Sequence, residues 1–199
     1  MNPRVVLALS LLCAFALGAA VLAANRGNGQ DSETASSAFA GARMPAGVRA
    51  PAFVLRDQDG RRVSMRSFRG RPVVVTFLYT HCQHSCPAQA QTVRGALDDL
   101  GHDVPALAVS VDPPRDTEDS ARAFLSKQHA LGRIDFVLGT RAQLQPVWKG
   151  FAILPQTPTQ EHMARITLVD KGGYQRVGFP GAEATPERLA HDLRLLERG

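Results

Sequence analysis

Cys82 and Cys86 are the residues of this sequence whose type and spacing most clearly suggest chemistry. They stand four apart in the stretch Tyr79–Pro87, which reads Tyr-Thr-His-Cys-Gln-His-Ser-Cys-Pro. A valine-rich, strand-like run precedes them, and Pro87 suits the first position of a following helix. The dipole and free N–H groups of a helix N-terminus favour thiolate. We therefore expect at least one of the two sulfurs to be nucleophilic or metal-binding at neutral pH.

The spacing of the pair separates two kinds of chemistry. Cys-x-x-Cys is the usual redox spacing, whereas three residues lie between Cys82 and Cys86. The wider loop lets both sulfurs face one ion, and a pair of thiolates is a soft site suited to Cu(I). A structural disulfide, or two buried cysteines without chemistry, remain the alternatives. The third cysteine, Cys13, lies in an apolar segment and is interpreted as a passive residue.

Composition limits the class of protein. The chain has 199 residues, 44% hydrophobic and 21% charged, which fits one ordinary globular domain with additional segments. The net charge of +5 is spread along the chain without a run of basic residues. We therefore predict no nucleic-acid binding, and at most a mild preference for an acidic partner or an anionic membrane.

The N-terminal segment, residues 1–24, is predicted to be a membrane anchor. Val5 to Ala24 is a stretch of twenty residues without a charge, preceded by Arg4. At about 1.5 Å per residue, this run spans a hydrocarbon core of about 30 Å. A cleaved signal peptide is the alternative, although the run is longer than a usual signal h-region. We expect the rest of the chain on the extracytoplasmic side, where a thiol pair tends to oxidise unless it is reduced or metallated.

The remainder divides into a flexible tether, residues 25–48, and a folded domain, residues 49–199. The tether is rich in Gly, Ser, Ala and Asn. The turn Asp59-Gly60 predicts an N-terminal β-hairpin extension. Alternating strands and helices that close with a hairpin and a helix predict an α/β, thioredoxin-like fold, with a central mixed β-sheet flanked by α-helices. We expect strands at 72–79, 104–111, 134–138, 166–169 and 174–179, and helices that begin near Pro87, Thr117, Thr140 and Pro186.

Four motifs then occur in an order that resembles the Sco/SenC family. They are Phe53–Gly60, Phe68–Pro72, the cysteine motif and the loop Ser110–Thr117, and the resemblance covers residues 51–179. It implies a membrane-anchored copper protein of thioredoxin fold that helps to assemble the dinuclear copper site of cytochrome c oxidase. The implied partners are subunit II of that oxidase and a protein that donates the copper.

The resemblance also implies a set of metal ligands, namely Cys82, Cys86 and His162. In the family the histidine stands eight residues before an aspartate on the next strand, as His162 stands before Asp170 here. The sequence departs from the family at Met163-Ala164, where Ser-Thr is frequent. It departs again inside the cysteine loop, where Gln83-His84 replaces a proline followed by a polar residue.

An observation that does not depend on the family resemblance also supports His162 as a metal ligand. Thioredoxin-like oxidoreductases usually carry a cis-proline that faces the cysteines just before this strand, but no proline lies between Thr159 and Asp170. Imidazole is a ligand for both Cu(I) and Cu(II). His84 is either an auxiliary ligand or a solvated loop residue, and His81 is not interpreted as a ligand.

Asp112 and Asp116 lie in the family-like loop Ser110–Thr117. Aspartate is a frequent turn former and helix cap. We interpret Asp112 as a turn former, and either Asp116 or Thr117 as the cap of the following helix.

Two functions follow, and they use the same sulfurs. The first is a copper chaperone that holds one copper ion and delivers it to cytochrome c oxidase. The second is an extracytoplasmic thiol–disulfide reductase in which Cys82 attacks and Cys86 resolves. Whether the chain is an enzyme therefore stays open, and a metallochaperone is preferred. His162 distinguishes the two functions, because copper binding requires it and disulfide exchange does not. A peroxiredoxin-type peroxidase is set aside because its motif would need proline and threonine where Val75 and Tyr79 stand.

Overall fold

The computed structural model describes residues 39–154, 164–181 and 183–199. The predicted anchor, residues 1–24, lies outside these ranges, and so does His162. Within them, no helix is long and apolar enough to cross a membrane.

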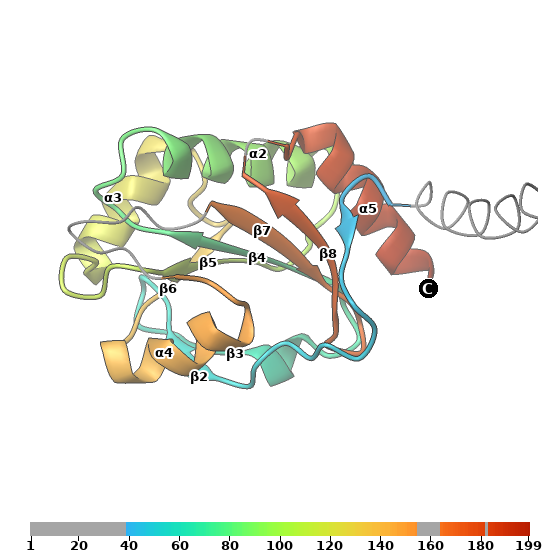
Figure 1. Cartoon of the computed structure of the whole chain (residues 1–199). Helices are drawn as coiled ribbons and strands as arrows, with labels where there is room; N and C mark the ends of the chain where they lie inside the picture. The colour runs from blue at the N-terminus through green and yellow to red at the C-terminus, as the bar shows by residue number, and fades with distance from the viewer. Residues whose placement is uncertain (1–38, 155–163, 182) are drawn as a thin grey trace, which may run out of the picture. The chain divides into compact units, whose positions relative to one another are not determined.

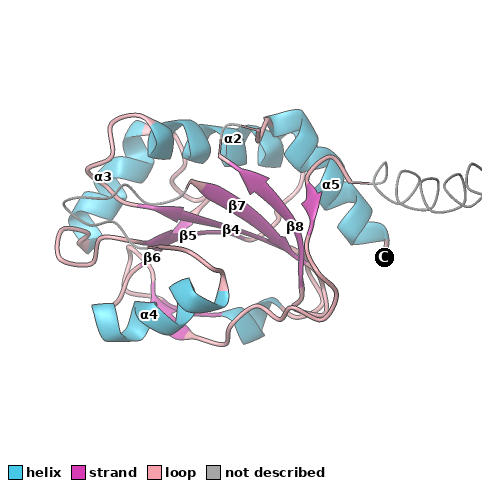
Figure 2. Cartoon of the chain, viewed as in Figure 1, coloured by secondary structure: helices cyan, strands magenta, loops and turns pink. Residues whose placement is uncertain are grey.

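A six-stranded mixed β-sheet forms the centre of the domain (Figures 1 and 2). β4 and β5 pair in parallel, as do β5 and β6, whereas β4–β7, β7–β8 and β8–β1 are antiparallel. In spatial order the strands are β1 (Ala42–Arg43), β8 (Gln175–Pro180), β7 (Arg165–Val169), β4 (Val73–Leu78), β5 (Ala106–Ser110) and β6 (Asp135–Val137).

The folded domain begins earlier than the sequence indicates. β1 falls within the segment predicted to be a tether, yet Ala42 pairs with Gly178 of β8. The buried carboxylate of Asp192 also accepts hydrogen bonds from the backbone N–H groups of Ala40 and Gly41, at 2.7 and 2.9 Å. Small and polar residues are typical of linkers, but here backbone hydrogen bonds and the packing of Phe39 against the core attach the segment to the domain.

Helices cover both faces of the sheet (Figure 1). The helices α2 (Ser85–Leu100), α3 (Glu118–Lys127) and α5 (Pro186–Arg198) pack on one face. The opposite face carries α4 (Arg141–Gly150), the predicted hairpin of β2 (Val54–Arg56) and β3 (Arg62–Ser64), and the 3₁₀ helix η1 (Met65–Phe68). This is the expected α/β arrangement of a mixed sheet flanked by helices.

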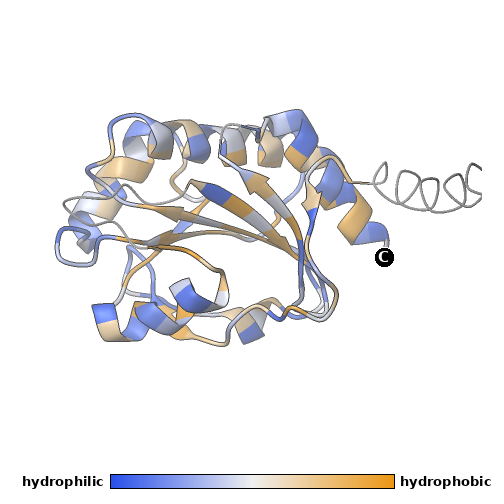
Figure 3. Ribbon diagram, viewed as in Figure 1, coloured by the Kyte–Doolittle hydropathy of each residue, from blue (hydrophilic) through white to orange (hydrophobic). Residues whose placement is uncertain are grey.

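β4 is the central strand and is buried along its whole length. Its side chains alternate between the two hydrophobic cores: Val74 and Leu78 face α2 and α5, whereas Val75 and Phe77 face α4. Figure 3 shows the apolar residues gathered along the sheet. Because β4 and β5 are parallel, their carboxyl ends meet at one edge of the sheet, the usual position of functional sites in α/β proteins. The cysteine loop after β4 and the loop after β5 therefore lie next to each other.

Candidate functional site

The cysteine loop connects the end of β4 to the start of α2. The helix begins at Ser85, two residues before the position predicted from Pro87, so the proline occupies the third helical position. This position still tolerates proline, because the first N–H groups of a helix have no partner inside it. His84 is the N-cap residue but makes no capping hydrogen bond through its side chain. The Cys82 sulfur partly takes over that role, because it accepts the backbone N–H of Cys86 at 3.2 Å.

The two cysteines differ in exposure although they lie on the same turn. Cys82 is 9% exposed, whereas Cys86 is fully buried against the core. Both are free thiols rather than a disulfide. The Cys82 sulfur also lies 3.4 Å from the Ser85 hydroxyl oxygen. The Cys82 side chain is thus partly accessible to solvent, whereas the Cys86 side chain is enclosed in the core.

The electrostatics of the pair are equally asymmetric. A hydrogen bond from the Cys86 side chain lowers the pKa of Cys82 well below its usual value, and the Ser85 hydroxyl and backbone N–H groups add to this against the opposing effect of burial. The same hydrogen bond and burial raise the pKa of Cys86. At neutral pH, Cys82 is therefore the thiolate and Cys86 the thiol that donates to it. This agrees with the expectation of one nucleophilic sulfur at a helix N-terminus.

Asp116 fixes the backbone just ahead of the cysteines. Its Oδ1 accepts hydrogen bonds from the Thr80 N–H and the Thr80 hydroxyl, both at 2.8 Å. Its Oδ2 accepts a hydrogen bond from the Ser110 hydroxyl at 2.6 Å. Burial raises the pKa of Asp116, and these hydrogen bonds oppose the shift. The side chain thus joins the loop after β4 to the end of β5.

Of the two residues predicted to be able to cap α3, Thr117 is confirmed and Asp116 was wrong. Thr117 caps α3, because its hydroxyl accepts the Ser120 N–H at 3.1 Å and the Ser120 hydroxyl accepts the Thr117 N–H at 2.8 Å. Asp112 is a turn former, as expected: its carbonyl accepts the N–H groups of Arg115 and Asp116, each at 3.0 Å. The signal that would have found Asp116 is topological, because loops after adjacent parallel strands meet at one sheet edge.

A groove of about 660 Å³ leads to Cys82 from the side of α3. The cysteine loop contributes Cys82 and Pro87 to its wall, and α3 contributes Phe124 and Lys127. A reacting group can therefore approach the exposed side of the Cys82 sulfur. Cys86 does not line this groove.

The histidines of the site are only partly placed. His81 and His84 are exposed, and His81 Nδ1 lies 3.0 Å from the Thr80 hydroxyl oxygen. In the described ranges, no group of three or more His, Cys, Asp or Glu side chains is arranged to hold a metal ion. His162 lies outside those ranges, so its position beside the two cysteines stays a prediction.

Comparison with known proteins identifies the family. The SCO1/SenC family model matches residues 43–197, which is most of the chain. The chain belongs to the SCO1/SenC family. Among its relatives, SenC of Rhodobacter capsulatus is 30% identical over 154 residues, a match that covers 71% of this chain and 67% of SenC. The first three curated relatives, all SCO proteins, are matched over 26% to 75% of their own length.

Solved structures of Sco proteins share the fold. ScoI of Bradyrhizobium japonicum, solved with copper bound, superposes with a TM-score of 0.60 at 29% identity, over 74% of this chain and 98% of that chain. BsSco, a member of the Sco family of cytochrome c oxidase assembly proteins, gives a TM-score of 0.68 at 23% identity, over 79% of this chain and 98% of that chain. The predicted thioredoxin-like Sco fold is thus confirmed for the domain.

Alkylation as a function of pH tests the ionisation of Cys82. The reduced, metal-free full-length protein in detergent should react with iodoacetamide at Cys82 at rates that change less than about twofold between pH 8 and pH 6. An ordinary thiol, with a pKa of about 8.5, loses about tenfold in thiolate for each pH unit below that value. A lowered pKa keeps the thiolate until the pH falls through the folded value, so the profile should be flat. Mass spectrometry assigns the modified cysteine.

The matched variant for this experiment is Cys86→Ala, which removes the largest cause of the lowered pKa. Its Cys82 rate should decline towards pH 6, because the thiolate has lost its donor. A wild-type rate that already falls about tenfold per pH unit below pH 8 would contradict the assigned proton arrangement.

Asp116→Asn tests the attachment of the cysteine loop. The amide nitrogen replaces one acceptor oxygen, so a buried donor of Thr80 or Ser110 loses its partner, at a cost of about 1–3 kcal/mol. Urea unfolding measures this loss. Asp119→Asn is the control, since its side chain is 96% exposed and the change should cost less than about 1 kcal/mol. Equal losses in the two variants would show that Asp116 does not hold the loop.

Proposed function

We propose that this chain binds one copper ion through Cys82, Cys86 and His162 and delivers it to the dinuclear copper site of subunit II of cytochrome c oxidase. The observation that carries the proposal is the sulfur pair on one helical turn, with one sulfur ionised and open to a groove. Membership of the SCO1/SenC family supports it. So does the copper bound by the relative from Bradyrhizobium japonicum.

The donor set fits Cu(I). Two thiolates are soft ligands, and one imidazole completes a three-coordinate site. Binding requires Cys86 to lose the proton that its raised pKa retains, so copper binding releases a proton and weakens as the pH falls. Three ligands leave an open coordination position for an incoming thiolate of the recipient. The groove beside Cys82 provides the path to that position.

The proposed location follows from the N-terminal sequence. Residues 1–24 anchor the protein in the membrane, and the segment after them connects the anchor to the domain, which begins at Phe39, on the extracytoplasmic side. There a copper-donor protein loads the site and the oxidase receives the ion. The uncharged stretch from Val5 to Ala24 is the support for this placement.

A thiol–disulfide reductase is the second candidate, because the asymmetry of the pair favours it specifically. The Cys82 thiolate would attack a disulfide of the partner, forming a mixed disulfide and releasing one partner thiol. Cys86, once deprotonated, would attack the Cys82 sulfur, close the Cys82–Cys86 disulfide and release the second thiol. The partner gains two electrons and this chain loses them. His162 takes no part in these steps.

Anaerobic Cu(I) titration against a chromophoric competitor tests the first candidate and separates the two. The reduced full-length protein in detergent should bind one equivalent. His162→Ala should weaken the affinity at least about tenfold, because one of three ligands is lost. His84→Ala is the matched control and should change the affinity by less than about twofold, since an exposed loop histidine outside the ligand set contributes little.

Two results would contradict copper delivery. If His162→Ala binds Cu(I) as tightly as the wild type, the three-ligand site is wrong. If both proteins bind Cu(I) weakly and reduce a disulfide substrate rapidly through Cys82, the reductase is the better description.

A further inference from the structure

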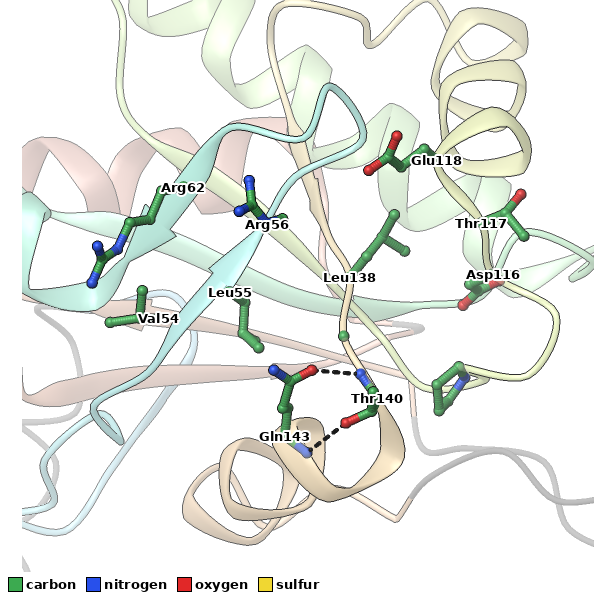
Figure 4. Close-up of a pocket in the computed structure, with 12 residues that line it drawn as sticks. Val54, Leu55, Arg56, Arg62, Asp116, Thr117, Glu118, Leu138, Thr140 and Gln143 are labelled. Atoms are coloured by element: carbon green, nitrogen blue, oxygen red, sulfur yellow. Dashed lines mark hydrogen bonds between the residues drawn. The ribbon is translucent and has the colours of Figure 1, made fainter.

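A second groove, of about 700 Å³, lies apart from the cysteines, beside the exposed face of the β2–β3 hairpin (Figure 4). Val54, Arg56 and Arg62 of the hairpin line it, and Leu138 and Thr140 line it from the segment between β6 and α4. The loop after β5 contributes Pro113 and Asp116. Neither Cys82 nor Cys86 is among its described lining residues.

Two arginines stand directly opposite each other at this groove. Arg56 and Arg62 are cross-strand partners in the hairpin, and both are exposed. Like charges placed directly opposite each other destabilise a sheet. Neither makes an ion pair with any carboxylate in the described part of the chain; Arg56 only donates to the Gly60 carbonyl, at 2.6 Å.

The acidic residues of the hairpin turn are already engaged. Asp59 pairs with Arg61 at 3.0 Å and with Arg122 at 3.3 Å. Asp57 accepts the backbone N–H groups of Asp59 and Arg61 at 2.9 and 2.8 Å. The hairpin therefore supplies no counter-charge to the Arg56–Arg62 pair.

The remaining wall of the groove combines positive potential with apolar surface. The helices α3 and α4 both begin at it, through Thr117 and Thr140, and helix N-termini favour negative charge. Val54 is 49% exposed, one of three large apolar residues that stand out on the described surface. Glu118 is the one exposed carboxylate in the lining, whereas Asp116 is buried and accepts hydrogen bonds from Thr80 and Ser110. The exposed part of the groove therefore carries two arginines against one carboxylate.

We propose that this groove binds a segment of a partner protein that carries carboxylates next to apolar side chains. The carboxylates would pair with Arg56 and Arg62, and an apolar side chain would cover Val54 and Leu138. The hairpin keeps a repulsive arginine pair because the partner supplies the missing charge. This surface is independent of the proposed copper function.

The position of the groove gives such a partner a route to the cysteine loop. Pro113 and Asp116 line the groove, and Asp116 holds the Thr80 backbone by the hydrogen bonds described above. Thr80 in turn lines the groove that leads to Cys82. Cys82 lines that groove and not this one, so a partner docked here would touch the loop after β5 without occupying the groove beside Cys82.

Nuclear magnetic resonance of the reduced, ¹⁵N-labelled full-length protein in detergent tests the proposal. The probe is an acetylated and amidated peptide, Ala-Leu-Glu-Leu-Glu-Ala, and its control replaces both glutamates by glutamine. The acidic peptide should cause saturable shifts of amide signals in residues 54–64, 113–118 and 138–143. Exchanging its glutamates, or making the variant Arg56→Gln/Arg62→Gln, should weaken binding at least about fivefold.

Matched variants separate this surface from general attraction between charges. Arg66→Gln removes an exposed arginine outside the groove and should change binding by less than about twofold, whereas Glu118→Gln should strengthen it. Val54→Ser should weaken it through the lost apolar contact. The double arginine variant should unfold no earlier than the wild type on heating, because it removes a repulsive pair.

Several results would overturn the proposal. One is the absence of saturable binding at peptide concentrations of about 5 mM, and another is a set of shifts confined to a different face. If acetate alone gives the same arginine-dependent shifts and Val54→Ser has no effect, the groove is a simple anion site. If the shifts at these residues follow protein concentration without peptide, the occupant is a second copy of this chain.

Discussion

The hydrogen bond from the Cys86 backbone N–H to the Cys82 sulfur is the interaction on which the site depends. It places a sulfur where a capping side chain would normally stand, and the free N–H groups at the start of α2 favour the charged form of that sulfur. The fully buried Cys86 follows on the same turn. The fold therefore provides two sulfurs of opposite protonation state within one short loop, which is the starting point of both candidate functions.

Keeping that loop in place requires structure from several parts of the chain. β4 is buried on both sides and sets the position where the loop begins. Asp116 connects Thr80 to Ser110, and the indole N–H of Trp148 donates to the Ser110 carbonyl at 2.8 Å. The site is thus linked through hydrogen bonds to the end of β5 and to α4. Rigid support of this kind lets a binding site favour one ligand geometry.

Much of this arrangement could be predicted from the sequence, because local patterns determine it. Alternating apolar residues identify the strands, Thr117, Thr140 and Thr185 mark helix starts, and the Asp59-Gly60 turn marks the hairpin. What escaped prediction depends on contacts between distant segments. Asp116 acts on Thr80, which is 36 residues away, and β1 is recognised only through its pairing with β8. The start of α2 was misplaced because a sulfur, which no capping rule includes, accepts the N–H there.

X-ray absorption at the copper edge of the Cu(I)-loaded full-length protein tests the central claim most directly, because it reports the atoms bound to the metal. The proposed site predicts two sulfur ligands and one nitrogen ligand, and the nitrogen should disappear in His162→Ala while both sulfurs remain. A single sulfur in the wild-type shell, or a nitrogen that persists without His162, would contradict the assignment of Cys82, Cys86 and His162 as the copper ligands.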